Sequence, residues 1–323
     1  YDKVTRDLLL YALLPASSGF EQGMLNIGKI RNRGFELSGS WSDTIGDDFR
    51  YTVSGNLTTI DNEVLTLGKT YYQGDKSVAV SEPGKPIGYF YGYEVEGIYQ
   101  NKADIASSPE NTLAAVAPGD LKFRDLDDNN VISIGKNTVD DPGDREIIGN
   151  SQPRYHYGAT LALQWAGIDF SIFFQGIGRQ DWYPAANALA FWGPYARPYA
   201  TYLPKNFHTQ IWSEENPNSY FPRPRGYTAL QGTNRELTAV NDRYLQNIGY
   251  CRLKNLTVGY TLPRQWTRKA LIESLRIYFT GENLFTWSGI RSDYIDPEMA
   301  ATNGNLRLSL IHISEPTRLQ LIS

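Results

Sequence analysis

Oxygen-bearing side chains stand at alternate positions in one short acidic stretch of the chain. Asp125, Asp127 and Asn129 are followed by Val131, whose backbone carbonyl would supply a fourth oxygen. Carboxylate, amide and carbonyl oxygens at this spacing are typical of the first half of a calcium-binding loop. The stretch therefore predicts a candidate calcium site at these four residues, and the sequence indicates no other cofactor.

The second half of that loop departs from the calcium pattern. Asn130 stands where the turn-making glycine is expected, and Lys136 stands where the bidentate glutamate is expected. Asn130 can still reach the left-handed backbone region, and a distal carboxylate would have to come from Asp140, Asp141 or Asp144. The alternative is an Asx-turn in a solvated loop, and the residues leave both interpretations open.

Aromatic residues gather in the segment between residues 179 and 247, which is also dense in proline and glycine. Flat rings offer a large contact area at low entropic cost, so such a segment can stack sugar rings or peptide side chains. The alternative is that the rings pack on one another. The rings nearest to the preceding strand are the candidate substrate-binding residues: Trp182, Tyr183, Trp192 and Tyr195.

No residue constellation indicates catalysis. His156 and His208 are far apart and lack metal-ligand spacing. The chain contains no glycine-rich phosphate loop, no nucleophile elbow and no His-Glu-x-x-His motif. The acidic pair Glu214–Glu215 consists of sequence neighbours, which point in opposite directions on a strand. We therefore expect a protein that is not an enzyme.

Strands of unusual length must position these loops. Segments of about ten residues recur in which apolar side chains alternate with polar or small ones. They cover residues 4–10, 32–41, 49–57, 155–165, 168–178, 250–261 and 275–285. On residues 155–165 one face carries Tyr157, Ala159, Leu161, Leu163 and Trp165, and on 168–178 it carries Ile168, Phe170, Ile172 and Phe174.

Such segments suit strands that cross an outer membrane. Short turns link their pairs at one end, whereas connections of roughly seventy to ninety residues follow at the other end, which is the asymmetry of a membrane barrel with long extracellular loops. We count about seven such strands, and seven cannot close a barrel without leaving backbone groups unsatisfied in lipid. The rings of Trp41, Trp165, Tyr260, Tyr278 and Phe285 are expected to form the interfacial belts.

Composition agrees with an all-β protein and excludes a nucleic-acid partner. Of 323 residues 13% are aromatic, which favours strands. The formal net charge is −4, so no basic surface is available for nucleic acid. The longest apolar run, residues 8–14, is too short to cross a bilayer as a helix. The single cysteine, Cys251, rules out an intrachain disulfide.

Five sequence blocks resemble the SusC/RagA group of TonB-dependent outer-membrane transporters. The similar family patterns are N-x-G-x-x-x-N-x-G-x-E-L at 26–37, P-G-D-x-K-F-x-D at 118–125, the strand entry IGNSQPRYHYG at 148–158, RLKNLTVGYTLP at 252–263 and GENLFT at 281–286. The likeness runs to about Met299.

The resemblance implies a transmembrane antiparallel β-barrel of 22 strands with a plug in its lumen, in the outer membrane of a Gram-negative bacterium. It also implies import of oligosaccharides or peptides, energy from TonB through an N-terminal box, and a SusD-like surface lipoprotein that closes over the loops. Plug and TonB box are missing here, and residue 1 already looks like the interior of a strand. We therefore expect a fragment.

Residues 1–307 are expected to be the C-terminal part of that barrel. Residues 308–318, LSLIHISEPTR, resemble a translated sequencing adapter, so 308–323 are expected to be a non-native tail.

The alternative function is a soluble secreted β-sandwich, either a carbohydrate-binding module or a glycoside hydrolase. It would use the same alternation with one face in a core. Strand length argues against it, because sandwich strands typically run about five or six residues.

Overall fold

The computed structural model describes most of the chain. The described residues are 1–13, 22–67, 71–72, 79–137, 141–186, 188–196, 205–225, 227–230, 236–292 and 294–300. The predicted tail at 308–323 lies outside them, and so does Asp140 of the acidic loop.

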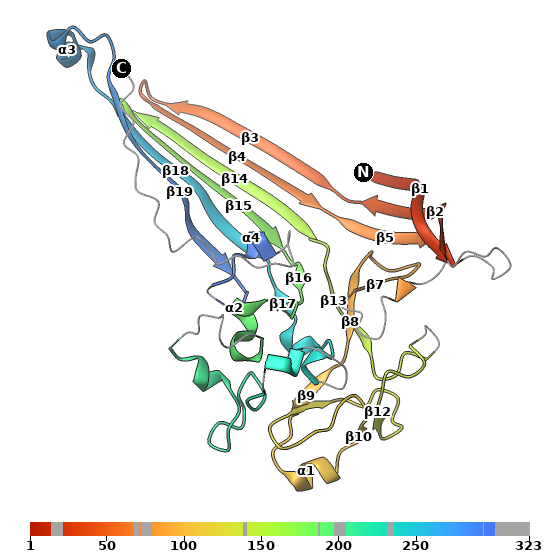
Figure 1. Cartoon of the computed structure of the whole chain (residues 1–323). Coiled ribbons are helices and arrows are strands. Elements are labelled where there is room, and N and C mark those ends of the chain that lie inside the picture. Colours follow the sequence, from red (N-terminus) through yellow and green to blue (C-terminus); the bar gives the residue numbers. More distant parts are fainter. Residues whose placement is uncertain are drawn as a thin grey trace.

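A six-stranded antiparallel sheet forms the largest element, in the order β19-β18-β15-β14-β4-β3 (Figure 1). Its strands are β3 (Glu36–Ile45), β4 (Phe49–Thr59), β14 (Tyr155–Trp165), β15 (Ile168–Gly178), β18 (Tyr250–Thr261) and β19 (Arg276–Ser288). The predicted bounds of β14, β15 and β18 are confirmed residue for residue. Local alternation was sufficient there because tight turns or loop residues delimit each strand.

The predicted single strand at 32–41 is wrong, because two strands meet there. β2 (Gln22–Arg33) ends before Gly34 and pairs with β1 (Asp2–Leu13) and β5 (Asp61–Thr66) in a three-stranded sheet, whereas β3 begins after Phe35. The Gly34 N–H donates to the Tyr1 carbonyl at 3.0 Å, and the Thr59 N–H donates to the Phe35 carbonyl at 2.8 Å. A Cβ on Gly34 would lie 1.9 Å from the Thr59 carbonyl oxygen, so close backbone approach causes the break.

The strand register carries one apolar face across the six-stranded sheet. Opposed residues on neighbouring strands share a face, and one such row is Trp165, Ile168, Tyr260 and Ile277. Another row is Trp41, Val53, Leu161, Ile172 and Leu256. Many of these side chains are exposed, including Trp41, Trp165 and Val258. The face assignments made from the sequence for β14 and β15 are therefore confirmed.

The opposite face of the same sheet is polar. Its rows include Ser40, Ser54 and Thr160, which oppose one another on β3, β4 and β14. Tyr278 opposes Gly259 on this face, and Arg276 lies over its ring at 4.8 Å. Tyr278 therefore does not share a face with the other four rings of the expected belts, because it is the sequence neighbour of Ile277 on β19.

The connections at the two ends of the sheet differ in size (Figure 1). At one end Gly46 to Asp48 join β3 to β4, Ala166 and Gly167 join β14 to β15, and a compact link joins β18 to β19. That link holds α3 (Arg264–Thr267) and the 3-10 helix η8 (Arg268–Ala270). At the other end, long connections run from β5 to β14 and from β15 to β18. The predicted asymmetry of turns and loops is thus confirmed.

The long connections fold into one packed body, which we call the loop lobe: the described residues of 88–154, 179–249 and 289–300. Short strand pairs stiffen it: β8 with β13, β9 with β11, β10 with β12 and β16 with β17. These strands are β8 (Tyr89–Gly92), β9 (Val95–Ile98), β10 (Glu110–Asn111), β11 (Leu121–Phe123), β12 (Val131–Ile132), β13 (Glu146–Asn150), β16 (Asp181–Trp182) and β17 (Gln246–Asn247). Two more, β6 (Tyr71–Tyr72) and β7 (Ala79–Ser81), extend the β8–β13 sheet.

The helices of the lobe are all short. They are α1 (Lys102–Ala106), α2 (Leu189–Trp192), α4 (Pro297–Ala300), and the 3-10 helices η3 (Gly193–Tyr195), η4 (Phe207–Gln210), η5 (Tyr227–Leu230), η6 (Glu236–Thr238) and η7 (Asp242–Tyr244). Within the described part of the chain, no helix has the length and apolarity needed to cross a membrane.

Replacing Gly34 by alanine tests the close approach of the Gly34 and Thr59 backbones at the end of β2. We expect Gly34→Ala to destabilise the protein by about 1–3 kcal/mol, because the new methyl group must push against the Thr59 backbone. Gly39→Ala on β3 is the matched control, since no atom lies within 4 Å of its added Cβ. Denaturant midpoints of the full-length protein should fall only for the first variant. Equal denaturant midpoints for the two variants would contradict the close backbone approach at Gly34.

Candidate functional site

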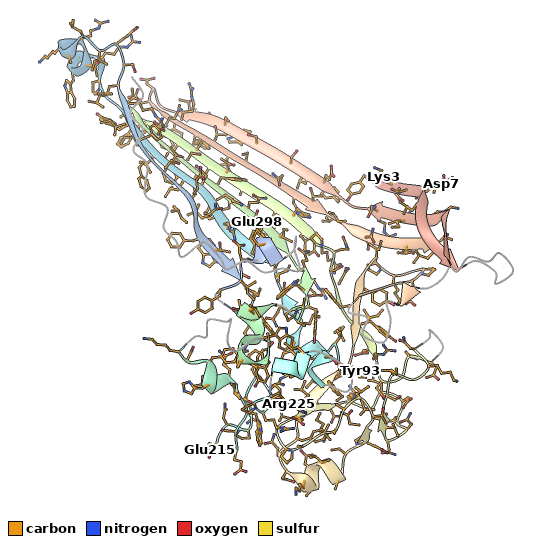
Figure 2. The ribbon with its side chains drawn as sticks, in the orientation of Figure 1. Lys3, Asp7, Tyr93, Glu215, Arg225 and Glu298 are labelled. Carbon is orange, nitrogen blue, oxygen red and sulfur yellow. The ribbon has the colours of Figure 1, made fainter. Side chains whose placement is uncertain are left out.

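The loop lobe brings together most of the residues that the sequence singled out. It lies beyond one end of the six-stranded sheet, and Figure 2 shows Tyr93 and Arg225 within it. Its apolar core combines residues from the first long connection, such as Phe90, with residues from the second, such as Phe191 and Phe221. Among the described residues of 179–247, aromatic rings therefore pack on one another, as the second alternative from the sequence expects.

The four predicted substrate-stacking rings all lie in the interior of this lobe. Trp182, Tyr183, Trp192 and Tyr195 are each at most 9% exposed. The Trp192 Nε1–H donates to the Ala185 carbonyl at 3.0 Å, and the Tyr195 hydroxyl donates to the Pro222 carbonyl at 2.7 Å. A buried ring with a bonded polar tip is typical of structural aromatic residues.

Edge-to-face contacts link these rings into a cluster. Phe191 and Trp192 have ring centroids 4.9 Å apart, and Trp192 and Tyr244 have centroids 5.0 Å apart, both nearly perpendicular. Direct stacking of a sugar or a peptide on Trp182, Tyr183, Trp192 or Tyr195 would need the lobe to open. That role stays a prediction, whereas the packing role is visible in the contacts.

Burial also changes the proton affinity of phenol groups in the lobe. Burial raises the pKa of the Tyr183 hydroxyl above its usual range, and it raises the pKa of Tyr220 to about 12. A charged phenolate is disfavoured where water is excluded. The phenols of Tyr183 and Tyr220 therefore stay neutral at physiological pH.

A buried carboxylate ties the two long connections together. Asp120 is fully buried. Its side-chain oxygens accept from Arg223 at 2.6 Å and from Arg225 at 2.7 Å, and one also accepts from the Ala117 N–H at 2.9 Å. Such charge-assisted bonds are strong and directional. Asp120 thus fixes the second connection against the first.

Gly119 completes this junction through its backbone. Its φ of +92° lies in a region that L side chains avoid, and an added Cβ would lie 2.5 Å from the Trp212 ring. The Gly119 N–H donates to the Tyr99 carbonyl at 2.6 Å, and its own carbonyl accepts from the Arg223 N–H at 2.7 Å. The block that resembles P-G-D is therefore the junction of the lobe. Sequence reasoning missed Arg223 and Arg225, and the repeat PRPR at 222–225 was the available signal.

The acidic loop brings together three carboxylates. Asp125, Asp127 and Asp144 each place an oxygen within 4.8 Å of the others. Asp144 is the distal carboxylate among the three predicted candidates, while Asp141 pairs with Lys136 at 3.3 Å. Within the described part of the chain, none of the three clustered carboxylates forms an ion pair with a basic side chain.

The other two predicted ligands lie beside this cluster. The Asn129 amide donates to Asp127 Oδ2 at 2.9 Å, and its oxygen accepts from the Val131 N–H at 2.7 Å. Asn130 has φ +63°, as predicted for the position of the missing glycine. Local turn bonds therefore already shape the loop, which is also what the Asx-turn alternative expects.

The carboxylates of the loop differ in their proton affinity. Desolvation pushes the pKa of Asp125 upward, but the N–H groups of Asn130 and Asn129 outweigh it and leave the pKa lowered. Desolvation raises the pKa of Asp127, and the nearby Asp144 charge adds to that rise. Repulsion between clustered carboxylates of this kind is what a bound cation relieves.

A second buried ion cluster joins the sheet to α4. Arg252 on β18 is almost fully buried and contacts Asp296 and Glu298, both at 2.6 Å. Lys254 contacts Glu298 at 2.9 Å. Figure 2 shows Glu298 beside the sheet at its lobe end. These ion pairs fix residues 296–298 against the six-stranded sheet. Sequence reasoning did not pair β18 with residues 296–298.

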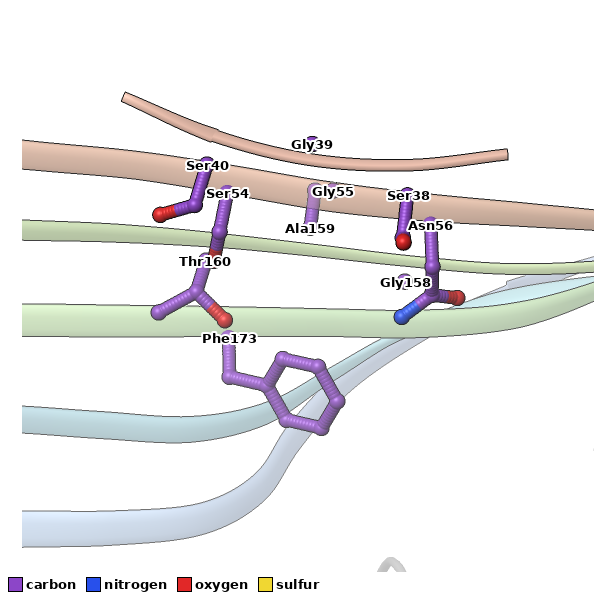
Figure 3. Close-up of a pocket in the computed structure, with 10 residues that line it drawn as sticks. All are labelled: Ser38, Gly39, Ser40, Ser54, Gly55, Asn56, Gly158, Ala159, Thr160 and Phe173. Atoms are coloured by element: carbon purple, nitrogen blue, oxygen red, sulfur yellow. The ribbon is translucent and has the colours of Figure 1, made fainter.

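A shallow recess of about 380 Å³ lies on the polar face of the sheet (Figure 3). Small or uncharged residues line it, including Ser38, Ser54, Asn56 and Thr160, with Phe173 at its edge. The lining contains no carboxylate, histidine or cysteine. The lining of the recess therefore offers no catalytic set.

Comparisons with known proteins show similarity along nearly the whole chain. No family model matches it. A TonB-dependent receptor of Formosa agariphila is 30% identical over 97% of this chain and 30% of its own length. TonB-dependent receptor SusC of Bacteroides thetaiotaomicron is 25% identical over 93% of this chain and 27% of its own length.

Solved structures share the fold. The RagAB peptide importer in its open-open state matches with a TM-score of 0.67 at 21% identity, over 92% of this chain and 29% of that one. The closed-closed state matches with a TM-score of 0.63, over 94% of this chain and 30% of that one. The chain thus spans about 30% of the length of these relatives.

Removing the Asp120 carboxylate tests the junction of the loop lobe. We expect Asp120→Ala to destabilise the lobe by roughly 3 kcal/mol, the lower end for breaking a buried pair, because both guanidinium groups keep some contact with water. Limited trypsin digestion of the full-length protein should cut faster after Arg225, whereas Arg223 precedes a proline and is not a trypsin site. Glu110→Gln, at an exposed position of β10, is the control. An unchanged cleavage rate for Asp120→Ala would contradict the junction.

Proposed function

Because the chain belongs to the SusC/RagA group of TonB-dependent receptors, we propose that it forms part of the wall and mouth of a nutrient importer. Receptors of this group are outer-membrane proteins of Gram-negative bacteria, and they are transporters rather than enzymes. The observation that carries the proposal is the two-faced sheet, with an exposed apolar face and a polar opposite face.

In this proposal the apolar face meets lipid and the polar face lines the lumen. All neighbouring strands of the sheet are joined by antiparallel ladders, with register shifts near Phe173 and Leu253. That arrangement suits a bilayer, where no water is present to bond exposed backbone groups. The edges of this sheet at β3 and β19 are then continued by the remaining strands of a 22-stranded barrel, of which residues 1–307 are the C-terminal part.

The alternative of a soluble β-sandwich is not favoured. A sandwich would bury the apolar rows against a second sheet. Among the described residues these rows are exposed, including Trp41, Trp165, Phe279, Phe285 and Trp287. An apolar surface of this extent on a soluble monomer would promote aggregation.

The loop lobe forms the extracellular mouth, because long loops lie outside the cell in barrels of this kind. A SusD-like lipoprotein closes over it, TonB acts through an N-terminal region, and the cargo is an oligosaccharide or a peptide. The relatives support this assignment: one is named SusC, and another is titled a peptide importer. The packed core of the lobe offers such a partner a pre-formed surface.

Uptake by cells tests the importer. Cells that express the full-length transporter with TonB and a SusD-like partner should accumulate fluorescent oligosaccharides or peptides, and cells without TonB should not. Co-purification should recover the lipoprotein. A full-length protein that stays monodisperse without detergent would instead support the soluble alternative.

A charge on either face of one strand tests which face meets lipid. We expect Ile172→Arg to destabilise the reconstituted transporter by about 2–4 kcal/mol, the range for arginine on the lipid face near the membrane centre. Ser171→Arg is the matched control on the polar face of the same strand, opposite Thr257, and should cost under about 1 kcal/mol. Denaturant midpoints in liposomes give the comparison. Equal effects at both positions would remove the assignment of faces.

We also propose that the acidic loop of the lobe binds calcium through Asp125, Asp127 and Asp144, with Asn129 and Val131 beside them. Three clustered carboxylates without a basic partner in the described residues support it. Calcium would supply charge neutralisation there and hold the loop in shape, with no role in chemistry.

Calorimetry on the full-length protein tests this proposal. We expect a dissociation constant on the order of 10⁻⁴ to 10⁻³ M, as in extracellular calcium modules. Asp127→Asn should weaken binding about tenfold by removing one ligand charge. Asp141→Asn is the control, because Asp141 pairs with Lys136 outside the cluster. If titration with calcium releases or absorbs no heat of binding, the Asx-turn interpretation remains.

A further inference from the structure

The link between β18 and β19 displays an unusual surface at the turn end of the sheet. Trp266 is 61% exposed and Leu271 is 97% exposed, and Ile272 is exposed as well. Arg264, Arg268 and Lys269 are exposed in the same short segment. Large apolar side chains and cations therefore protrude together from α3 and η8, which Figure 1 shows at the end of the sheet opposite the loop lobe.

The backbone of this link holds its side chains outward. The Leu262 N–H donates to the Leu275 carbonyl at 2.9 Å, and the Ile272 N–H donates to the Thr267 carbonyl at 3.1 Å. Thr267 alone of the residues 264–273 is buried. Leu271 has φ +60°, a left-handed conformation that costs energy for a leucine. No packing within the described protein offsets that cost, because the side chain is almost fully exposed.

The charge of the link is opposite to that of the chain. Residues 264–273 hold three cations and one anion, Glu273, whereas the whole chain has a formal net charge of −4. Among the described residues, no ion pair involves Arg264, Arg268 or Lys269. The β3–β4 turn at the same end of the sheet carries Asp47 and Asp48 instead. The cationic and apolar surface is thus local to one link.

The link continues the apolar face of the sheet. Tyr260 and Ile277, the last exposed apolar pair before the link, oppose each other on β18 and β19. Beyond the hydrocarbon edge of a bilayer come headgroups with phosphate charges, where tryptophan and basic side chains are favoured together. The protein surface changes along the sheet axis as a membrane boundary does. The apolar face of the sheet comes first, and the link then adds exposed aromatic and aliphatic side chains together with cations.

We infer that Trp266, Leu271, Ile272, Arg264, Arg268 and Lys269 form a lipid anchor that binds the phosphate headgroups of anionic phospholipids at the periplasmic leaflet of the outer membrane. This inference rests on the proposed function, because short turns lie on the periplasmic side of such barrels. The anchor fixes the height of β18 and β19 in the bilayer. It also gives this link a partner that the acidic β3–β4 turn cannot bind.

Nitroxide labels in the full-length transporter, reconstituted in phosphatidylglycerol nanodiscs, test the anchor. Labels are placed at Leu271→Cys, at Asp47→Cys and at Val258→Cys, each in a Cys251→Ser background. Val258 is an exposed wall residue of β18. We expect the label at 258 to be reached by oxygen and not by a water-soluble nickel complex, the label at 271 to lie at headgroup depth, and the label at 47 to lie in water.

The outcomes separate the anchor from the importer. A label at 271 in water beside a label at 258 in lipid overturns the anchor and leaves the wall intact. Labels at 258 and 271 both in water overturn the proposed function as well. Exclusion of both oxygen and nickel at 271 means that a protein partner covers the link, which also overturns the anchor.

Lipid competition tests the cations. Native mass spectrometry of the transporter measures retained phosphatidylglycerol against phosphatidylcholine. The triple variant Arg264→Gln, Arg268→Gln, Lys269→Gln should lose preference for phosphatidylglycerol by on the order of fivefold for each cation removed. The double variant Lys102→Gln, Lys205→Gln, at exposed positions of the loop lobe, is the control. Equal preference in triple variant and control would overturn headgroup binding.

Discussion

Register is the constraint on which the rest of the structure depends, because it commits every residue of the sheet to one of two faces. A slip of one residue along any ladder would exchange the apolar and polar faces of a whole strand. The ladders from β3 to β19 keep Trp165, Ile168, Tyr260 and Ile277 in one row. The shifts near Phe173 and Leu253 are absorbed without loss of the partition, since Leu253 and Phe285 still share the apolar face.

The loop lobe is stabilised by a different interaction, since its segments have no long ladder. Aromatic rings supply most of the buried apolar surface, and hydrogen bonds to buried charged groups fix the orientation of the segments. Asp120 bonds to Arg223 and Arg225 from the other connection, and the Val95 N–H donates to Asp242 across the same boundary. A loop that gained only apolar contacts could pack in several ways, whereas a buried carboxylate with two fixed donors admits few arrangements. The two long connections therefore fold as one body.

Features that depend on a local residue pattern were predicted from the sequence. Features that depend on contacts between residues far apart in the chain were missed. Alternation placed β14, β15 and β18 to the residue, because a period of two needs no partner to be recognised. It could not place the break at Gly34, which depends on the approach of Thr59 from another strand. Ring types marked Trp192 and Tyr195 as important, but exposure depends on the whole lobe. Asp120 and Arg223 lie 103 residues apart, so no local pattern joins them.

Because the sheet and the loop lobe are stabilised differently, they tolerate amino-acid substitutions differently. Wall residues are constrained by face alone, so many apolar side chains would serve at Val258 or Ile172. Lobe residues are constrained by shape and charge together, so Trp192 or Asp120 has few substitutes. If the lobe is the mouth of the proposed importer, its packed loops present a fixed surface, and little ordering entropy is lost on capture. In that proposal the buried rings and the buried carboxylate hold the exposed side chains of the lobe in the arrangement that meets cargo and partner.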